Sequence, residues 1–268
     1  SVLSLGLLGL GVFYEVKLPL LVGLASGGAL VARLVNAGHY FTLCKPDFRP
    51  RLMDIDLTVI GRLSQVGGVF LVINILTAIS YGFDNFFISV SLGAAAVAQY
   101  AIAQRIFQVV RVGKIAVTPL WPAFSEALSR GDYDWCQRTV WRAIFYSVSV
   151  SSALAIVLTA IGPMFLQICL GKTVEVSWSM LIGFAVWSVI LGYLAPVGVF
   201  LSSGAFASLQ IALLAPACAV AVTLKIIFLP RVGAVGTVWA NIVAFLCCYV
   251  IPSMCMWKRL RARHSSVE

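Results

Sequence analysis

The chain has 268 residues, of which 61% are hydrophobic and 11% are charged, and its formal net charge at pH 7 is +9. Soluble domains average about 45–50% apolar and about 25% charged residues, so this composition excludes a soluble enzyme: too little polar surface is present to cover a globule. The mean hydropathy of +0.99 agrees. The sequence therefore predicts an integral membrane protein.

Long apolar runs, broken by glycine, proline and charged residues, predict transmembrane helices. A spanning helix needs about 20 apolar residues, and backbone groups in lipid must be hydrogen-bonded within their own segment. The predicted spans are 1–14, 18–43, 66–91, 95–119, 142–162, 177–201, 206–229 and 232–257. The expected fold is thus an all-α integral membrane bundle of about eight transmembrane helices. Because the first run is short and has no signal-peptide features, we expect a C-terminal fragment of a longer chain.

The distribution of Lys and Arg between the loops predicts the orientation of the bundle, because cytoplasmic loops carry the excess of these residues. One set of loops holds eleven of them: Lys45, Arg49, Arg51, Arg62, Arg130, Arg138, Arg142, Lys258, Arg259, Arg261 and Arg263. The alternate set, with its helix ends, holds four: Lys17, Lys172, Lys225 and Arg231. We therefore expect the C-terminus to be cytoplasmic.

Two connections have patterns of their own. In the connector 46–65, apolar and polar residues fall on opposite helical faces, which predicts an amphipathic helix lying in the membrane interface; a solvated linker is the alternative. In the loop 126–142, Asp132 is placed as the N-cap of a helix, and Trp135 and Trp141 as interfacial anchors.

Polar and charged residues inside the apolar spans are the candidate functional residues, because charge at bilayer depth is costly and tolerated only against protein or water. Asp84 and Asn85 interrupt the third span. On the fourth span Tyr100, Gln104, Gln108 and Arg111 share one helical face, flanked by Arg105 and Lys114. Arg33 and Asn36 mark a similar face on the second span, and Asn74 lies level with Arg111 on the neighbouring helix.

The hairpin of the third and fourth spans predicts an ion pair between Asp84 and Arg105, because the two residues lie about 4.5 Å apart along the helix axes. The remaining cations of these spans have no internal counter-ion. Three explanations stay open: acids from other helices, movement of the Lys114 ammonium to the membrane edge, or a cavity that receives an anion through Arg111.

Features of soluble and metal-dependent enzymes are missing from the sequence. The seven cysteines have no CxxC spacing and the two histidines form no metal motif, so we expect no catalytic residues, no metal and no cofactor. Gly236, Ala240 and Ala244 recur every four residues and predict close helix packing. Pro196 and Pro216 lie in the middle of spans, as sites of flexing or as ordinary packing irregularities.

Three segments carry a family likeness: FDNFFISVSLG (83–93) with AVAQYAIAQRIFQ (96–108), PLWPAFSEALSRGDYDW (119–135) and, more weakly, PRVGAVGTVWANIVAF (230–245). The chain resembles the Wzx-type polysaccharide and O-antigen flippases of the multidrug/oligosaccharidyl-lipid/polysaccharide (MOP) exporter superfamily. The resemblance covers nearly the whole chain. It implies two six-helix lobes, of which this chain has the last two helices of the first and the complete second.

The resemblance also implies a domain organisation and a function. Residues 1–45 would end the N-terminal lobe, 46–65 would connect the lobes, 66–257 would form the C-terminal lobe, and 258–268 a basic cytoplasmic tail. The protein would flip a polyprenyl-diphosphate-linked oligosaccharide across the bacterial cytoplasmic membrane for surface polysaccharide assembly. The implied partners are the lipid-linked glycan, membrane lipids and glycan-assembly proteins, with no nucleic acid.

Three other readings remain as alternatives, one of which is a scaffold that transports nothing. A drug or cation antiporter of the same fold needs buried acids for a cationic substrate. A membrane-embedded glycan polymerase or glycosyltransferase needs a long outward loop or an acidic metal cluster, and the largest predicted outward loop is 163–176.

Overall fold

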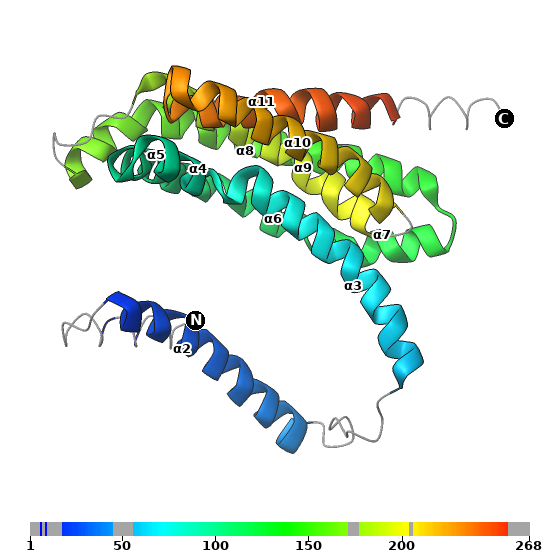
Figure 1. Ribbon diagram of the computed structural model, residues 1–268. Helices are drawn as coiled ribbons and strands as arrows, with labels where there is room; N and C mark the ends of the chain where they lie inside the picture. The colour runs from blue at the N-terminus through cyan, green and yellow to red at the C-terminus, as the bar shows by residue number, and fades with distance from the viewer. Residues whose placement is uncertain are drawn as a thin grey trace. The chain divides into compact units, whose positions relative to one another are not determined.

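The computed structural model describes residues 18–44, 56–170, 177–203 and 206–256, together with Gly6 and Gly9 (Figure 1). Within these ranges some side chains, including those of Arg62, Arg111 and Lys114, are not described. Every regular element in the described ranges is a helix. The chain divides into two compact units, Ser1–Ser64 and Gln65–Glu268.

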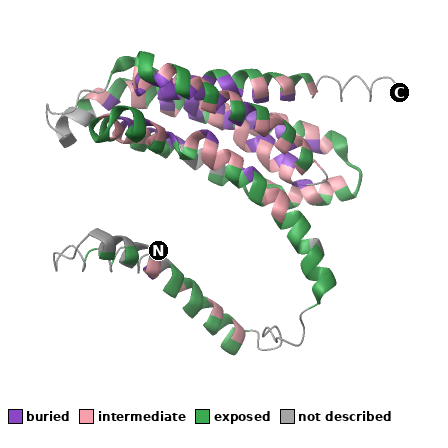
Figure 2. Cartoon of the chain, viewed as in Figure 1, coloured by how far each residue is buried: buried purple, intermediate pink, exposed green. Residues whose placement is uncertain are grey.

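The first unit contains α2 (Leu18–His39), which continues into the π-helix η1 (Tyr40–Cys44). Most described residues of α2 are exposed, including Arg33 and Asn36 (Figure 2). The predicted domain 1–45 and the predicted spans 1–14 and 18–43 fall on this unit, and residues 1–14 lie, apart from Gly6 and Gly9, outside the described residues.

Among the described residues, the second unit is built from nine α-helices and three other helical turns. They are α3 (Leu57–Thr77, beginning in the first unit), η4 (Ala78–Gly82), α4 (Asp84–Leu92), α5 (Ala94–Phe107), η5 (Gln108–Arg111), α6 (Val112–Val117), α7 (Leu120–Ser129), α8 (Tyr133–Leu170), α9 (Trp178–Ser202), α10 (Ala207–Val232), α11 (Val235–Phe245) and η7 (Leu246–Val250).

Helix α3 begins directly after Asp56. The Asp56 carboxylate accepts hydrogen bonds from the backbone N–H of Thr58 (2.8 Å) and from its hydroxyl (2.7 Å), as an N-cap side chain does. Both hydrogen bonds, above all the one from the Thr58 hydroxyl, stabilise the ionised carboxylate and hold the pKa of Asp56 below its usual value. The connector residues from Leu57 onward are therefore the first turns of α3, whereas 46–55 lie outside the described residues.

The chain changes helix type just before the buried acid. The π-helix η4 follows α3, and Phe83, with φ −90° and ψ 11°, separates it from α4. Gly93 then turns the chain with φ +81°, a backbone conformation that suits glycine. The predicted third span, 66–91, is thus present as α3, η4 and α4 in succession.

The predicted fourth span, 95–119, is not one straight α-helix. It is divided into the 14-residue α5, the 3₁₀ turn η5 and the six-residue α6. A 3₁₀ turn advances about 120° per residue rather than about 100°. The polar face predicted for Tyr100, Gln104, Gln108 and Arg111 assumed an unbroken α-helix, so that geometry does not hold beyond Phe107.

Helices α8 to α11 form the tightly packed part of the unit. α8 packs against α9, α10 against α11, and α11 against α9. The predicted close packing at Gly236 is confirmed: a Cβ there would lie 2.9 Å from the Phe228 Cβ and 3.0 Å from the Phe228 carbonyl oxygen. Asp132 accepts a hydrogen bond from the Trp135 N–H (3.0 Å) and caps α8, as predicted.

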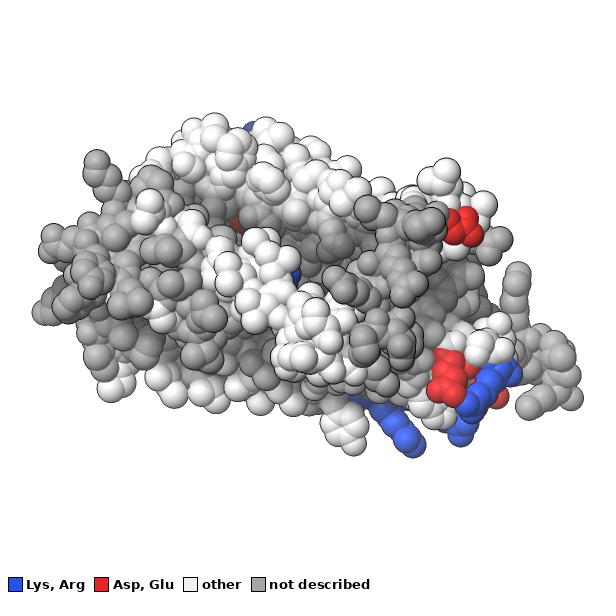
Figure 3. Space-filling view, turned by 90° about the horizontal axis from the view of Figure 1, so that it is seen from below, with Lys and Arg blue, Asp and Glu red and all other residues white. Residues whose placement is uncertain are grey.

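Five helical segments of the described chain are long and apolar enough to cross a membrane: Leu57–Leu92, Tyr133–Met164, Trp178–Ser202, Ala207–Val232 and Val235–Met256. The outer surface agrees, because many large apolar side chains such as Phe145, Ile156 and Ile226 are exposed. On the face drawn in Figure 3, the described residues are mostly uncharged, and the charged side chains among them stand in small groups. The chain is an all-α membrane-type protein, and the count of about eight spans is not confirmed.

Candidate functional site

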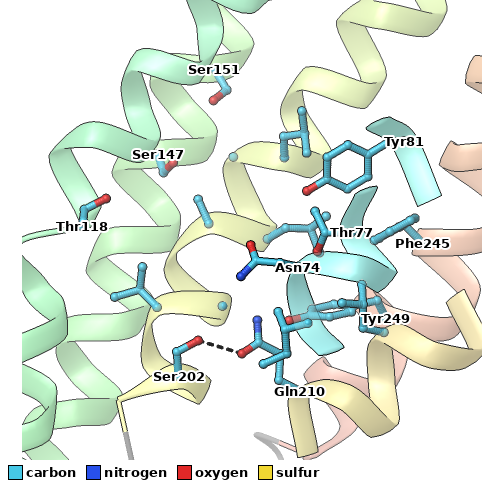
Figure 4. Close-up of a pocket in the computed structure, with 18 of the residues that line it drawn as sticks. Asn74, Thr77, Tyr81, Thr118, Ser147, Ser151, Ser202, Gln210, Phe245 and Tyr249 are labelled. Atoms are coloured by element: carbon cyan, nitrogen blue, oxygen red, sulfur yellow. Dashed lines mark hydrogen bonds between the residues drawn. The ribbon is translucent and has the colours of Figure 1, made fainter. Parts of the chain in front are cut away.

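A cavity of about 550 Å³ lies inside the second unit, between its helices (Figure 4). It is bounded by residues of α3, η4, α5, η5, α8, α9, α10, α11 and η7, and by Thr118 and Trp121 beside and within α7. Its polar lining residues are Asn74, Thr77, Tyr81, Thr118, Ser147, Ser151, Ser188, Ser202, Gln210 and Tyr249.

The polar part of the lining consists of hydroxyl and amide side chains. None of the described lining residues is Asp, Glu, Lys or Arg. Asn74 donates its amide N–H to the Phe70 carbonyl (2.8 Å), which leaves its side-chain oxygen directed away from that bond. The Ser202 hydroxyl donates to the Gln210 side-chain oxygen (2.8 Å), linking α9 to α10 at one end of the cavity (Figure 4). Neutral hydrogen-bonding groups thus face a space inside an apolar bundle.

The apolar part of the lining is strongly aromatic. Tyr81 and Phe245 meet edge to face with ring centroids 6.0 Å apart, and Phe245 stacks with Tyr249 at 6.3 Å. Trp121 lines the cavity near Thr118 and donates its indole N–H to the Ser202 carbonyl (3.0 Å). A pocket of this kind offers flat apolar faces together with a few convergent polar groups, the usual composition of a small-molecule site.

The most buried charges of the described chain form a pair away from this lining. Asp84 of α4 is 2% exposed and Lys225 of α10 is completely buried, and the Lys225 Nζ lies 2.6 Å from an Asp84 carboxylate oxygen. The same ammonium donates to the Ser80 carbonyl and lies 5.7 Å from the Phe87 ring centroid. Ser80 belongs to η4, so the π-helix presents a carbonyl to the lysine.

Two further donors complete the environment of Asp84. The Tyr100 hydroxyl (2.7 Å) and the Asn241 amide (3.0 Å) both donate to its second carboxylate oxygen. The carboxylate is therefore held by α5, α10 and α11 at once. Asn241 keeps its side-chain oxygen without a partner among the described residues, as does Asn85.

The predicted Asp84–Arg105 pair is wrong. Arg105 is exposed and takes part in neither of the two ion pairs of the described residues, which are Asp84–Lys225 and Glu126–Arg130. The register of the hairpin predicts Arg105 near Asp84 along the helix axes. In the structure, α10 packs against η4 and α4 and brings Lys225 to the Asp84 carboxylate instead.

Comparisons with known protein families, characterised proteins and solved structures find no match to this chain.

The other predicted site residues separate in the structure. Asn74 lines the cavity, whereas Tyr100 is buried against Asp84 and Phe184. Gln104 is half-buried and Gln108 is exposed, and neither is among the described lining residues. Helix α5 and the turn η5 meet the cavity at two apolar residues, Phe107 and Val110. Phe107 stacks on Phe184 with centroids 5.9 Å apart, which turns the polar residues of α5 elsewhere.

For four of the predicted site residues, the structure does not test the predicted role. The side chains of Arg111 and Lys114 are outside the described residues. Arg33 and Asn36 belong to the first unit, where both are exposed. The predicted roles of these four residues in an anion path therefore stay predictions.

Sequence reasoning missed Lys225 and the serines of the cavity. Lys225 was grouped with the loop cations, although it stands within an apolar run four residues or more from any other charge. Ser147, Ser151 and Ser188 are hard to single out in the sequence, because a serine inside a membrane helix costs little and is common. The four-residue spacing of Ser147 and Ser151, which puts both on one helical face, was the available signal.

Proposed function

We propose that this chain belongs to a membrane transporter that moves a polyprenyl-diphosphate-linked oligosaccharide across the bacterial cytoplasmic membrane, with sugar residues accommodated in the cavity of the second unit. The observation that supports this most is the lining: hydroxyl and amide groups occur together with aromatic rings inside a bundle with many exposed apolar side chains. Sugars present hydroxyls at the ring edge and C–H groups on the ring face, and this lining offers partners for both.

The uncharged character of the described lining favours a particular placement of the substrate. The described lining has no charged side chain, so we assign the sugars to the cavity and the diphosphate to the cationic residues of the predicted stripe, Arg111 above all. A guanidinium offers paired donors that fit phosphate oxygens. The resemblance to the Wzx-type flippases supports the same substrate class.

The drug or cation antiporter is less well supported. Such a protein needs a buried acid that faces its substrate. Asp84 is the one fully buried acid of the described chain, and it is already bonded to Lys225, Tyr100 and Asn241 rather than facing the cavity.

Filling the cavity tests the proposal. In the organism that encodes the chain, deletion of the gene should abolish the surface glycan and trap its lipid-linked precursor at the cytoplasmic face. Re-expression of the wild-type protein should restore export. Ala195→Trp, at a lining position of α9, should not restore it, whereas Ala153→Trp, at an exposed position of α8, should.

Both tryptophan variants must be present at wild-type levels in the membrane, as measured by immunoblot. Normal export by the Ala195→Trp protein would argue against substrate in the cavity. An unchanged surface glycan in the deletion strain would argue against the transport function itself.

A further inference from the structure

Where α8 meets α9, the cavity wall contains a buried hydroxyl group that has no hydrogen-bond partner among the described residues. Ser147 is 5% exposed and lines the cavity, and its hydroxyl has no hydrogen-bond partner among the described residues. A buried hydroxyl without a partner reduces stability. A ligand that hydrogen-bonds to the Ser147 hydroxyl therefore supplies a partner that the described protein groups do not.

On α9, the residue that packs against Ser147 and Ser151 is Gly192, and a larger residue would not fit there. A Cβ on Gly192 would lie 2.6 Å from the Ser151 hydroxyl oxygen and 3.1 Å from the Ser147 carbonyl oxygen. Only glycine allows α9 to approach the two serines so closely. Pro196, four residues later, has no N–H to donate to the Gly192 carbonyl, so the usual helical partner of that acceptor is missing within the wall.

A third hydroxyl extends the wall along α9. Ser188 is buried, lines the cavity and lies one turn before Gly192. Figure 4 shows Ser147 and Ser151 projecting from one helix into the space, with Tyr81, Thr77 and Asn74 on its other side. Three serine hydroxyls are thus clustered at one place, across the cavity from the Tyr81 ring.

We infer that the wall formed by Ser147, Ser151, Ser188 and Gly192 is a subsite for the hydroxyl groups of one uncharged sugar ring, whose apolar face lies toward Tyr81 and Phe245. This inference rests on the proposed function and narrows its substrate. Sugar hydroxyls can both accept hydrogen bonds from serine hydroxyls and donate to them. A carboxylate or phosphate at the same place would be buried without a counter-charge from any described lining residue, which is unfavourable.

Titration of oligosaccharides tests the inference. The chain is placed in lipid nanodiscs free of sugar detergents, and dissociation constants are measured by ligand-observed NMR. The probes are cellotriose and tri-N-acetylchitotriose, which are neutral, and trigalacturonate, which is acidic. We expect at least one neutral probe to bind at least about tenfold more tightly than trigalacturonate.

The serine variants locate the binding. Ser147→Ala should weaken binding of the neutral probe about five- to tenfold, the value of one hydrogen bond. Ser149→Ala, at an exposed position of the same helix, is the matched control and should bind as the wild type does. Ser188→Ala gives a second, independent reading of the same wall if the Ser147 variant is poorly folded.

Each outcome is decisive. Equal binding by the wild type and by both wall variants would overturn the subsite while leaving sugar binding, and so the proposed function, in place. Equal or tighter binding of trigalacturonate would overturn the uncharged class. No binding of either neutral probe by the wild type would overturn the inference, and the Ala195→Trp export experiment would then judge the proposed function separately.

Discussion

A lysine and an aspartate, Lys225 and Asp84, are buried side by side in apolar helices. Removing an ion from water costs several kcal/mol, and the mutual attraction recovers it only when the remaining hydrogen-bonding capacity is also satisfied. Here Ser80, Tyr100 and Asn241 supply those bonds. The pair thus fixes how α4, α5, α10 and α11 meet.

Breaking this pair from one side should be far more damaging than removing it. We expect Asp84→Asn and Lys225→Met each to destabilise the protein by about 3–5 kcal/mol, because one charge is left buried alone, and the double variant by much less than the sum. Denaturant unfolding in micelles measures this, and Arg105→Gln, at an exposed position, should change stability by no more than about 0.5 kcal/mol. Additive losses at Asp84 and Lys225 would contradict the pairing.

The sequence identified Asp84 as a paired acid but named the wrong partner. Hairpin register relates residues only within one pair of adjacent helices, and it therefore pointed to Arg105. The actual partner lies 141 residues further along the chain, where nothing local links it to Asp84. Long-range packing of α10 against η4 and α4 decides the contact, and spacing within one hairpin cannot predict that.

At the scale of elements, small residues set the distances between helices. Gly236 allows α11 to touch the backbone of α10, and Gly192 allows α9 to touch α8 beside the cavity. The four-residue repeat at Gly236, Ala240 and Ala244 predicted the first contact, because a small residue on every turn leaves one flat helical face. The second is a single glycine with no repeat around it, and only the structure reveals it.

Gly236→Ala should destabilise the bundle by about 1–3 kcal/mol, the usual cost of overpacking, since the new methyl group would meet the Phe228 backbone, which cannot move aside as a side chain can. Thermal unfolding measures the change. Gly162→Ala is the matched control, because its Cβ would be 3.9 Å from a Leu181 methyl group, an ordinary contact. Equal melting temperatures for the two variants would show that the α10–α11 contact tolerates a Cβ.

Some helix boundaries are predictable because they depend on residues close in sequence, and others are not because they depend on tertiary contacts. Asp132 predicted the start of α8, because capping depends on neighbours in sequence. The division of 95–119 into α5, η5 and α6 occurs where Phe107 stacks on Phe184 of α9 and Val110 lines the cavity. The mainly apolar run predicted a single helix there, and tertiary contacts of this kind cannot be read from the local sequence.

At the scale of the whole molecule, the membrane character follows from composition, and the orientation remains a prediction from the loop cations. We expect the turn between α7 and α8 to be cytoplasmic and the residue before α9 to face outward. In a variant without native cysteines, Ser177→Cys should react with an impermeant thiol reagent added to intact cells. Ser129→Cys should react only after the membrane is opened. The reverse pattern would invert the predicted orientation.

The central claim is that a lipid-linked glycan occupies the cavity, and site-specific photocrosslinking in living membranes tests it most directly. A benzophenone amino acid replaces Asn74, at the cavity lining, or Val90, which is exposed on α4, in cells whose surface sugars are radiolabelled. After illumination, the account predicts labelled glycan covalently attached to the protein at position 74 and none at position 90. Labelling at position 90 alone, or at neither position while the protein is present and the precursor abundant, would contradict it.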